Sequence, residues 1–118
     1  MKRNFRLTRT RDFNTIKKEG TSRRNKLAVL VYLNNGRDTS RSAIVTSKSV
    51  GNAVTRNLVK RRMRACIANA WSEIELGWDL VFYARTAVTS ASYQELKRAI
   101  YQLLEQAGLI IDQQSNVN

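Results

Sequence analysis

The stretch KSVGNAVTRNLVKRRMR, residues 48–64, decides how the chain is arranged. It carries six lysines or arginines and no acid. Gly51 supplies a turn residue, and the Asn52 side chain can accept hydrogen bonds from the first free N–H groups of a helix, which predicts a helix from about Ala53. At 3.6 residues per turn, one side of this helix is basic and the opposite side is apolar. The basic row is Arg56, Lys60 and Arg64, the adjacent row is Asn57 and Arg61, and the apolar side is Val59, Met63, Cys66, Ile67 and Ala70.

The absence of acids on this helix favours an external polyanion. Like charges four residues apart destabilise an isolated helix by about 0.2–0.5 kcal/mol per pair, so a structural helix would normally interleave glutamates. A merely solvated face is the alternative. The net charge is +12; residues 1–64 hold 18 basic and three acidic residues, whereas residues 65–118 hold three basic and six acidic ones. This asymmetry predicts a polyanion-binding part followed by a mainly structural part.

The overall composition indicates one domain, residues 1–118, that folds without a disulfide or a metal. Cys66 is the one cysteine and there is no histidine, so we expect neither an internal disulfide nor a zinc site. No apolar run approaches the ~20 residues of a membrane span, and the first residues lack the apolar segment of a signal peptide. We expect a soluble, cytoplasmic protein with a frayed tail at residues 112–118.

Apolar patterning predicts the remaining elements. A short helix places Phe13 and Ile16 inward and ends at Gly20 in a left-handed residue; its spacing alone favours a core role for Phe13 over a base-stacking platform. Strands are predicted at 27–33, 42–47 and 79–85. Asn35-Gly36 indicates a hairpin between the first two strands, and the intervening helix makes the last two parallel. The final helix begins at a capping box of Ser92 and Glu95 and ends at Gly108, and it carries little functional signal.

The chemistry favours binding over catalysis. Without histidine, acid–base and nucleophilic catalysis lose their usual agent. Asp12, Glu19 and Asp38 are scattered among separate elements, which does not suggest two-metal chemistry, and no phosphate-binding glycine motif is present. A membrane is disfavoured because the apolar side of the helix must cover the sheet, and DNA because nothing resembles a compact helical reading module. RNA is favoured, since a sheet face flanked by a short helix and a basic helix can enclose a single strand.

Residues 47–64 closely resemble the protein subunit of bacterial ribonuclease P. That family places Gly-Asn-Ala-Val just before an Arg-Asn-x-x-Lys-Arg-x-x-Arg helix. The resemblance extends to RLTRTRDF at 6–13, to the apolar strand at 27–33 and to DLVFYAR at 79–85, and only the last residues fall outside it. The matching motif residues are Gly51, Asn52, Ala53, Val54, Arg56, Asn57, Lys60, Arg61 and Arg64.

The resemblance implies an α+β, single-domain sandwich of order α-β-β-β-α-β-α. One mixed sheet would carry packed helices, with a first short strand near Thr21–Asn25 and a left-handed crossover around the basic helix. The family implies binding to the ribonuclease P RNA subunit and to the 5′ leader of precursor tRNA. It also implies that the RNA, with Mg²⁺, performs the hydrolysis, so the protein itself would hold no cofactor and no catalytic residue. The implied RNA-binding residues are Lys48, Asn52, Arg56, Asn57, Lys60, Arg61 and Arg64, and the implied leader groove is Arg9, Arg11, Phe13 and Lys17.

The chain departs from the family pattern at a few positions. Leu58 stands where the family commonly has arginine, and Arg62 where it usually has an apolar residue. Lys17 replaces a second aromatic one turn beyond Phe13, and Val31 replaces an aromatic on the long strand. Leader binding is therefore expected to lean more on charge and less on stacking. The alternative function is a ribosomal-type protein that binds folded RNA without supporting a reaction.

Overall fold

Most of the basic stretch lies in helix α2, Ala53–Ala70, which begins at Ala53 as predicted. Asn52 begins it, because the Asn52 Oδ1 atom accepts a hydrogen bond from the Thr55 backbone N–H at 2.9 Å. The helix then presents one buried stripe to the rest of the protein. This computed structural model describes residues 6–7 and 10–111, with the backbone only at positions 10 and 11. All five residues predicted on the apolar side are buried: Val59, Met63, Cys66, Ile67 and Ala70.

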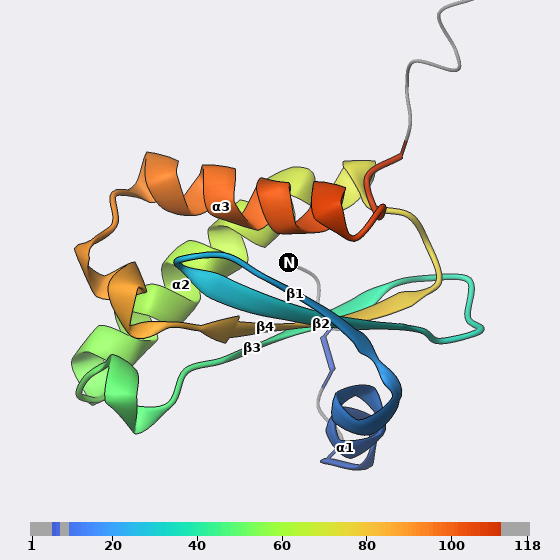
Figure 1. The fold of residues 1–118 in the computed structure, drawn as a ribbon, viewed down its shortest axis with the longest axis horizontal. Helices are drawn as coiled ribbons and strands as arrows, with labels where there is room; N and C mark the ends of the chain where they lie inside the picture. Colours follow the sequence, from blue (N-terminus) through green and yellow to red (C-terminus); the bar gives the residue numbers. More distant parts are fainter. Residues whose placement is uncertain (1–5, 8–9, 112–118) are drawn as a thin grey trace, which may run out of the picture.

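The sheet has four strands in the order β1-β2-β4-β3 (Figure 1). Strand β2 pairs antiparallel with both β1 and β4, whereas β3 pairs in parallel with β4. The sheet is therefore mixed, and the predicted parallel pair joined through α2 is confirmed. The left-handed sense of that crossover remains a prediction. The strands are β1 Thr21–Arg24, β2 Ala28–Asn34, β3 Arg41–Val45 and β4 Trp78–Ala84.

The predicted hairpin between the strands at 27–33 and 42–47 is wrong, because β4 lies between them. Val31 of β2 and Ala43 of β3 both face Val81 of β4. The turn itself is present, with Gly36 at φ 67°. It is closed by its own side chains: Asn34 Oδ1 accepts from the Gly36 N–H at 3.0 Å. The turn therefore needs no β2–β3 pairing, and β4, buried over most of its length, takes the central place.

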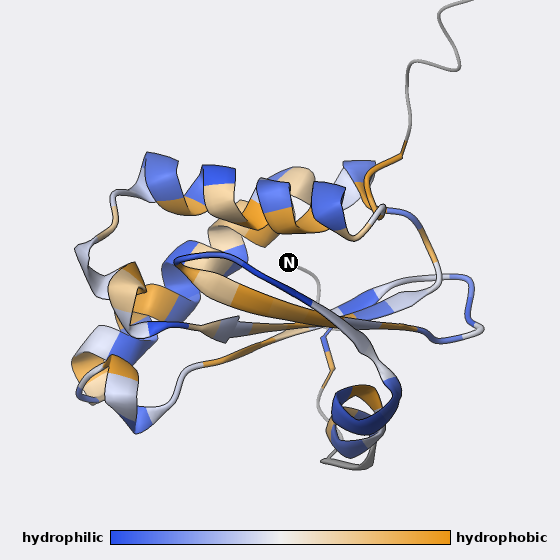
Figure 2. Cartoon of the chain, in the orientation of Figure 1, coloured by the Kyte–Doolittle hydropathy of each residue, from blue (hydrophilic) through white to orange (hydrophobic). Residues whose placement is uncertain are grey.

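Helices cover both faces of the sheet (Figure 1). Helices α2 and α3, Tyr93–Gln106, lie on one face, and the shorter α1, Thr10–Glu19, lies on the other. Figure 2 shows the side of α3 that faces inward as hydrophobic and its outer side as hydrophilic. The large core lies between the sheet and α2 and α3, and a smaller cluster lies beneath α1. Short 3₁₀ helices connect these elements at η2 Lys48–Val50, η3 Trp71–Glu73 and η4 Thr86–Ser90.

The ends of α3 follow their predicted local signals. Ser92 Oγ accepts from the Glu95 N–H at 3.1 Å, and Glu95 Oε1 accepts from the Ser92 N–H at 3.0 Å, so the capping box is complete. Gly108, at φ 72°, follows the helix in the left-handed region. Among the described residues, no helix is long and apolar enough to cross a membrane. The predicted frayed tail, residues 112–118, lies outside the described residues.

Gly20 ends α1 for a different reason from the one predicted. Its φ is not positive, so the expected left-handed residue is wrong. A Cβ at this position would instead lie 2.5 Å from the Ile16 carbonyl oxygen and 2.9 Å from that of Tyr32. Glycine is required here because the end of α1 approaches the backbone of β2 too closely for any side chain.

Candidate nucleic-acid interface

Helix α2 presents its cations at two depths. Arg56, Lys60 and Arg64 flank the buried stripe and are half-buried, whereas Asn57 and Arg61 are exposed. None of these cations pairs with a carboxylate among the described residues, where the ion pairs are formed by Arg41. Their charge is therefore not neutralised within the described part of the protein and is available to an external anion.

Among the described residues, two buried polar side-chain atoms have no hydrogen-bond partner: Arg56 Nε and Thr46 Oγ1. Arg56 is in the first turn of α2, and Thr46 directly follows β3. A buried donor left unsatisfied costs about 1–3 kcal/mol, more for a charged group. A phosphate oxygen at Arg56 would remove that cost.

The remaining predicted residues of this site, Lys48 and Asn52, lie in the connection before α2 and at its start. Lys48 is exposed in η2, and Asn52 is exposed at the start of the helix. The Oδ1 atom of Asn52 is engaged in the helix cap, so this residue also has a structural role that the prediction did not include. Leu58 is 40% exposed and Val54 78% exposed on the same helix. The exposed surface of α2 therefore combines cations with two apolar side chains.

A small cleft of about 140 Å³ joins the two predicted sites at the outer edge of β3. Phe13 of α1 and Arg64 of α2 both line it. Residues 6–7 extend the sheet edge there, because the Leu7 N–H donates to the Ser42 carbonyl at 2.8 Å. The basic row of α2 and the first helix are thus neighbours across β3. The full lining is Arg6, Leu7, Phe13, Ser42, Ala43, Ile44 and Arg64.

The structure describes the side chains of two of the four predicted leader-groove residues, Phe13 and Lys17. Phe13 is half-buried, packs against the cluster of Leu7, Ile16 and Val81, and also lines the cleft, so the core role that its spacing favours is combined with access to the groove. Lys17 is exposed on α1. Arg9 lies outside the described residues, and Arg11 lies in α1 with its side chain outside the description.

Arg41 holds α1 against the sheet. Its Nε and Nη2 atoms donate to Asp79 of β4 at 2.9 and 2.7 Å, and its Nη1 atom lies 3.4 Å from Asp12 Oδ2 of α1. The hydrogen bonds to Asp79 raise the pKa of the Arg41 guanidinium above its usual value. Asn35 Nδ2 donates to the same carboxylate at 2.9 Å. This arginine is thus an internal tie that positions α1.

Sequence reasoning missed Arg41 and Arg6. It placed Arg41 in a turn, and only the register Arg41↔Asp79 between β3 and β4 reveals its partner. A usable signal was the alternation of Arg41 with Ala43 and Val45 on one side of a strand, but this required knowing that the strand begins at Arg41. For Arg6, the bridge to Ser42 is a long-range contact with no local signal.

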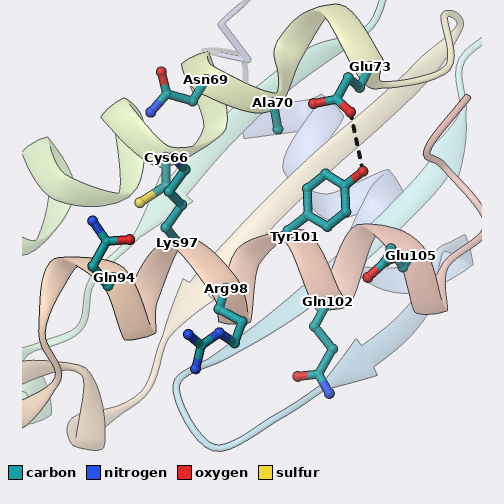
Figure 3. A pocket seen from close by; sticks show the side chains of 10 residues that line it. All are labelled: Cys66, Asn69, Ala70, Glu73, Gln94, Lys97, Arg98, Tyr101, Gln102 and Glu105. Atoms are coloured by element: carbon teal, nitrogen blue, oxygen red, sulfur yellow. Dashed lines mark hydrogen bonds between the residues drawn. The ribbon is translucent and has the colours of Figure 1, made fainter.

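A larger hollow, about 770 Å³, lies elsewhere, between α2 and α3 (Figure 3). Lys97 and Arg98 contribute two positive charges to it, and Glu73 and Glu105 two negative ones. Glu73 also accepts a hydrogen bond from the Tyr101 hydroxyl at 3.2 Å (Figure 3). Because these charges balance, this hollow is a poor site for a polyanion despite its size. Among the described residues, no group of three or more histidine, cysteine, aspartate or glutamate side chains could hold a metal ion.

Comparison with known proteins agrees with this geometry. Residues 1–108 match the model of the family described as Ribonuclease P. The Ribonuclease P protein component of Streptococcus pyogenes serotype M49 (strain NZ131) is 40% identical over 110 residues, which cover 93% of this chain and 92% of that protein. The structure of the Staphylococcus aureus RNase P protein matches with a TM-score of 0.83 at 31% identity, covering 90% of this chain and 97% of that one. The RNase P protein from Thermotoga maritima matches with a TM-score of 0.79 at 31% identity, covering 86% and 96%. The chain therefore belongs to the Ribonuclease P protein family.

Proposed function

We propose that this chain is the protein subunit of ribonuclease P, which binds the catalytic RNA through α2 and helps it remove the 5′ leader of precursor tRNA. The observation that carries the proposal is the row Arg56, Lys60 and Arg64, which has no carboxylate partner among the described residues and includes a buried, unsatisfied Arg56 Nε. The family match supports this reading over a ribosomal-type RNA-binding protein. Because precursor tRNA in bacteria is made in the cytoplasm, we also propose that the protein acts there.

The cleft at the outer edge of β3, which both α1 and α2 reach, suggests how one small protein can bind two RNAs. Arg64 and Phe13 line the same cleft, one from each helix. A catalytic RNA bound along α2 would therefore lie near the outer edge of β3, and a single-stranded leader could run from that edge over the opposite face of the sheet, beside α1. Lys48, Asn52, Asn57 and Arg61 are exposed, and we assign them to contacts with the catalytic RNA.

We propose that the RNA subunit supplies the hydrolytic chemistry and binds the magnesium ions. The described carboxylates do not fit a protein-bound site, because they form no group large enough to hold a metal ion. The protein's own part is to bind and orient: cations of α2 neutralise phosphates, and α1 with the sheet face positions the leader.

Reconstitution tests this function. The purified protein is added to the ribonuclease P RNA of its bacterium at low magnesium, and cleavage of precursor tRNA is measured. We expect cleavage only when both subunits are present. Equal cleavage by the RNA alone would refute an assisting role, and cleavage by the protein alone would refute the assignment of the chemistry to RNA.

The salt dependence of RNA binding tests the role of α2. If about five side chains each neutralise one phosphate, log Kd against log salt should have a slope of roughly 3.5–4.5 in magnitude. Replacing Arg56, Lys60 and Arg61 together by glutamine should reduce this magnitude by roughly 2–3. The matched control is Arg62→Gln, because Arg62 is exposed on the same helix outside the row. An unchanged slope in the triple variant would refute the proposed contacts.

A further inference from the structure

On the face of the sheet that carries α1, the exposure of the side chains increases towards the end of β4. Side chains alternate between the faces of a strand, so Asp79, Val81 and Tyr83 share this face. Asp79 is 5% exposed and Val81 is fully buried, whereas Tyr83 is half-buried. Val81 belongs to the cluster beneath α1, and Tyr83 packs at the margin of that cluster. The cover that α1 provides therefore ends between Val81 and Tyr83.

Strand register places Tyr83 in a row that crosses the whole sheet. Arg24 of β1 pairs with Val29 of β2, Val29 pairs with Tyr83 of β4, and Tyr83 pairs with Val45 of β3. We call these four residues the Tyr83 row. None of the four is buried, and Arg24 is fully exposed at the sheet edge. The row is an accessible apolar strip with one aromatic ring in it and one cation at its end.

We propose that Tyr83 is the base-stacking platform of this protein and contacts one nucleobase of the precursor tRNA leader. This inference rests on the function proposed above. The positions at which the family resemblance implies an aromatic carry Lys17 and Val31. Tyr32 cannot replace them, because it is buried on the opposite face beside Trp78, with ring centroids 6.0 Å apart. Tyr83 supplies an aromatic ring one strand away, on the face that the leader would use.

The surroundings of Tyr83 suit a single strand of RNA. Stacking on an aromatic side chain tolerates any base, because every base has a π-face. Neighbouring strands lie about 4.8 Å apart, so Arg24, two strands away, begins about 10 Å from Tyr83 and its side chain can reach a phosphate of the adjacent nucleotide. On the other side of Tyr83, Val45 adds a half-buried apolar side chain to the same face. The row thus offers stacking near its centre and a cation at one end.

The experiment measures binding of precursor tRNA to the reconstituted holoenzyme with the variant Tyr83→Ile. Isoleucine keeps an apolar residue of high strand propensity at this position. We expect leader-bearing substrate to bind about 5- to 150-fold more weakly, as for the loss of one stacked base, and substrate without a leader to bind unchanged. Tyr83→Phe should bind like the unaltered protein. The matched control is Tyr101→Leu, which removes another half-buried tyrosine between α2 and α3.

A set of leaders with single abasic nucleotides locates the base. With the unaltered protein, one abasic position should weaken binding; with Tyr83→Ile, that position should no longer matter. If Tyr83→Ile fails to fold, Tyr83→Trp tests the same idea, since its larger ring should strengthen binding of the intact leader but not of the abasic one. Equal losses for substrates with and without a leader, or an abasic effect that persists in Tyr83→Ile, would overturn the role of Tyr83 while leaving the proposed function intact. Failure of the unaltered protein to support cleavage at all would overturn both.

Discussion

Replacing Arg41 by methionine should cost about 3 kcal/mol of folding stability. The side chains of Arg41 and Asp79 are 15% and 7% exposed, so the ion pair is largely desolvated. Removing one partner of such a pair costs about 3–5 kcal/mol, because the other charge remains buried without compensation. We take the lower end, since Asn35 Nδ2 would still donate to Asp79 and Arg41 retains some solvent contact.

Thermal unfolding followed by circular dichroism measures this loss. Unfolding entropy is roughly 2.1 cal/mol/K per residue, or about 0.25 kcal/mol/K for this chain, so a 3 kcal/mol loss should lower Tm by about 12 °C. The double variant Arg41→Met/Asp79→Leu removes both charges and should recover to within about 1 kcal/mol of the original stability. Arg37→Met, at an exposed arginine of the neighbouring turn, is the control and should change stability by less than about 0.5 kcal/mol.

Two results would refute this reasoning. If Arg41→Met unfolded within about 3 °C of the original protein, the ion pair would not be desolvated in the way that its exposure indicates. If the double variant were as unstable as the single one, the loss would come from packing or from the contact with Asp12, not from an uncompensated Asp79 charge.

Four further predictions concern local features. Gly20→Ala should lower stability by about 1–3 kcal/mol in urea unfolding, because its Cβ would meet two carbonyl oxygens; an unchanged midpoint would contradict the close approach. Ser92→Ala should cost about 0.5–2 kcal/mol through loss of the α3 cap, measured in the same way. Hydrogen bonds from Ser92 lower the pKa of the Glu95 carboxylate. The contribution of this carboxylate to the free energy of unfolding is therefore complete above its unfolded pKa and is lost as the pH falls through its lower folded pKa. Glu95→Gln should flatten the acidic part of a plot of the free energy of unfolding against pH. Burial raises the pKa of the Cys66 thiol, so a disulfide reagent should label it only when the protein unfolds, and rapid labelling of the folded protein would contradict its burial.

Local signals predicted the helices of this protein well. The Asn52 cap, the buried stripe of α2 and the capping box at Ser92 depend on residues within a few positions of one another. Such contacts form wherever the helix forms, so spacing alone reveals them. The exposure of the α2 cations was predictable for the same reason, because a helix that buries one side against the core must turn its other side towards solvent.

Apart from the parallel pairing of β3 with β4, long-range contacts were not predictable from spacing. The Asn35-Gly36 turn was predicted correctly, yet β4 and not β3 pairs with β2, because a strand's partner depends on which strand best fills the centre of the sheet. Gly20 was predicted as a terminator, but its role comes from an approach to Tyr32 in another element. For the candidate site, the cleft between Phe13 and Arg64 also joins residues far apart in the sequence.

The sequence by itself determined that one helix carries unneutralised positive charge, that this helix buries its opposite side, and that the chain resembles one RNA-binding family. The tertiary structure alone decided which residues meet: Arg41 with Asp79 and Asp12, Arg64 with Phe13, and Tyr83 with Val29 and Val45. The physical reason is that helical spacing and charge are local properties, whereas strand register and helix packing are set by the burial of apolar surface over the whole chain.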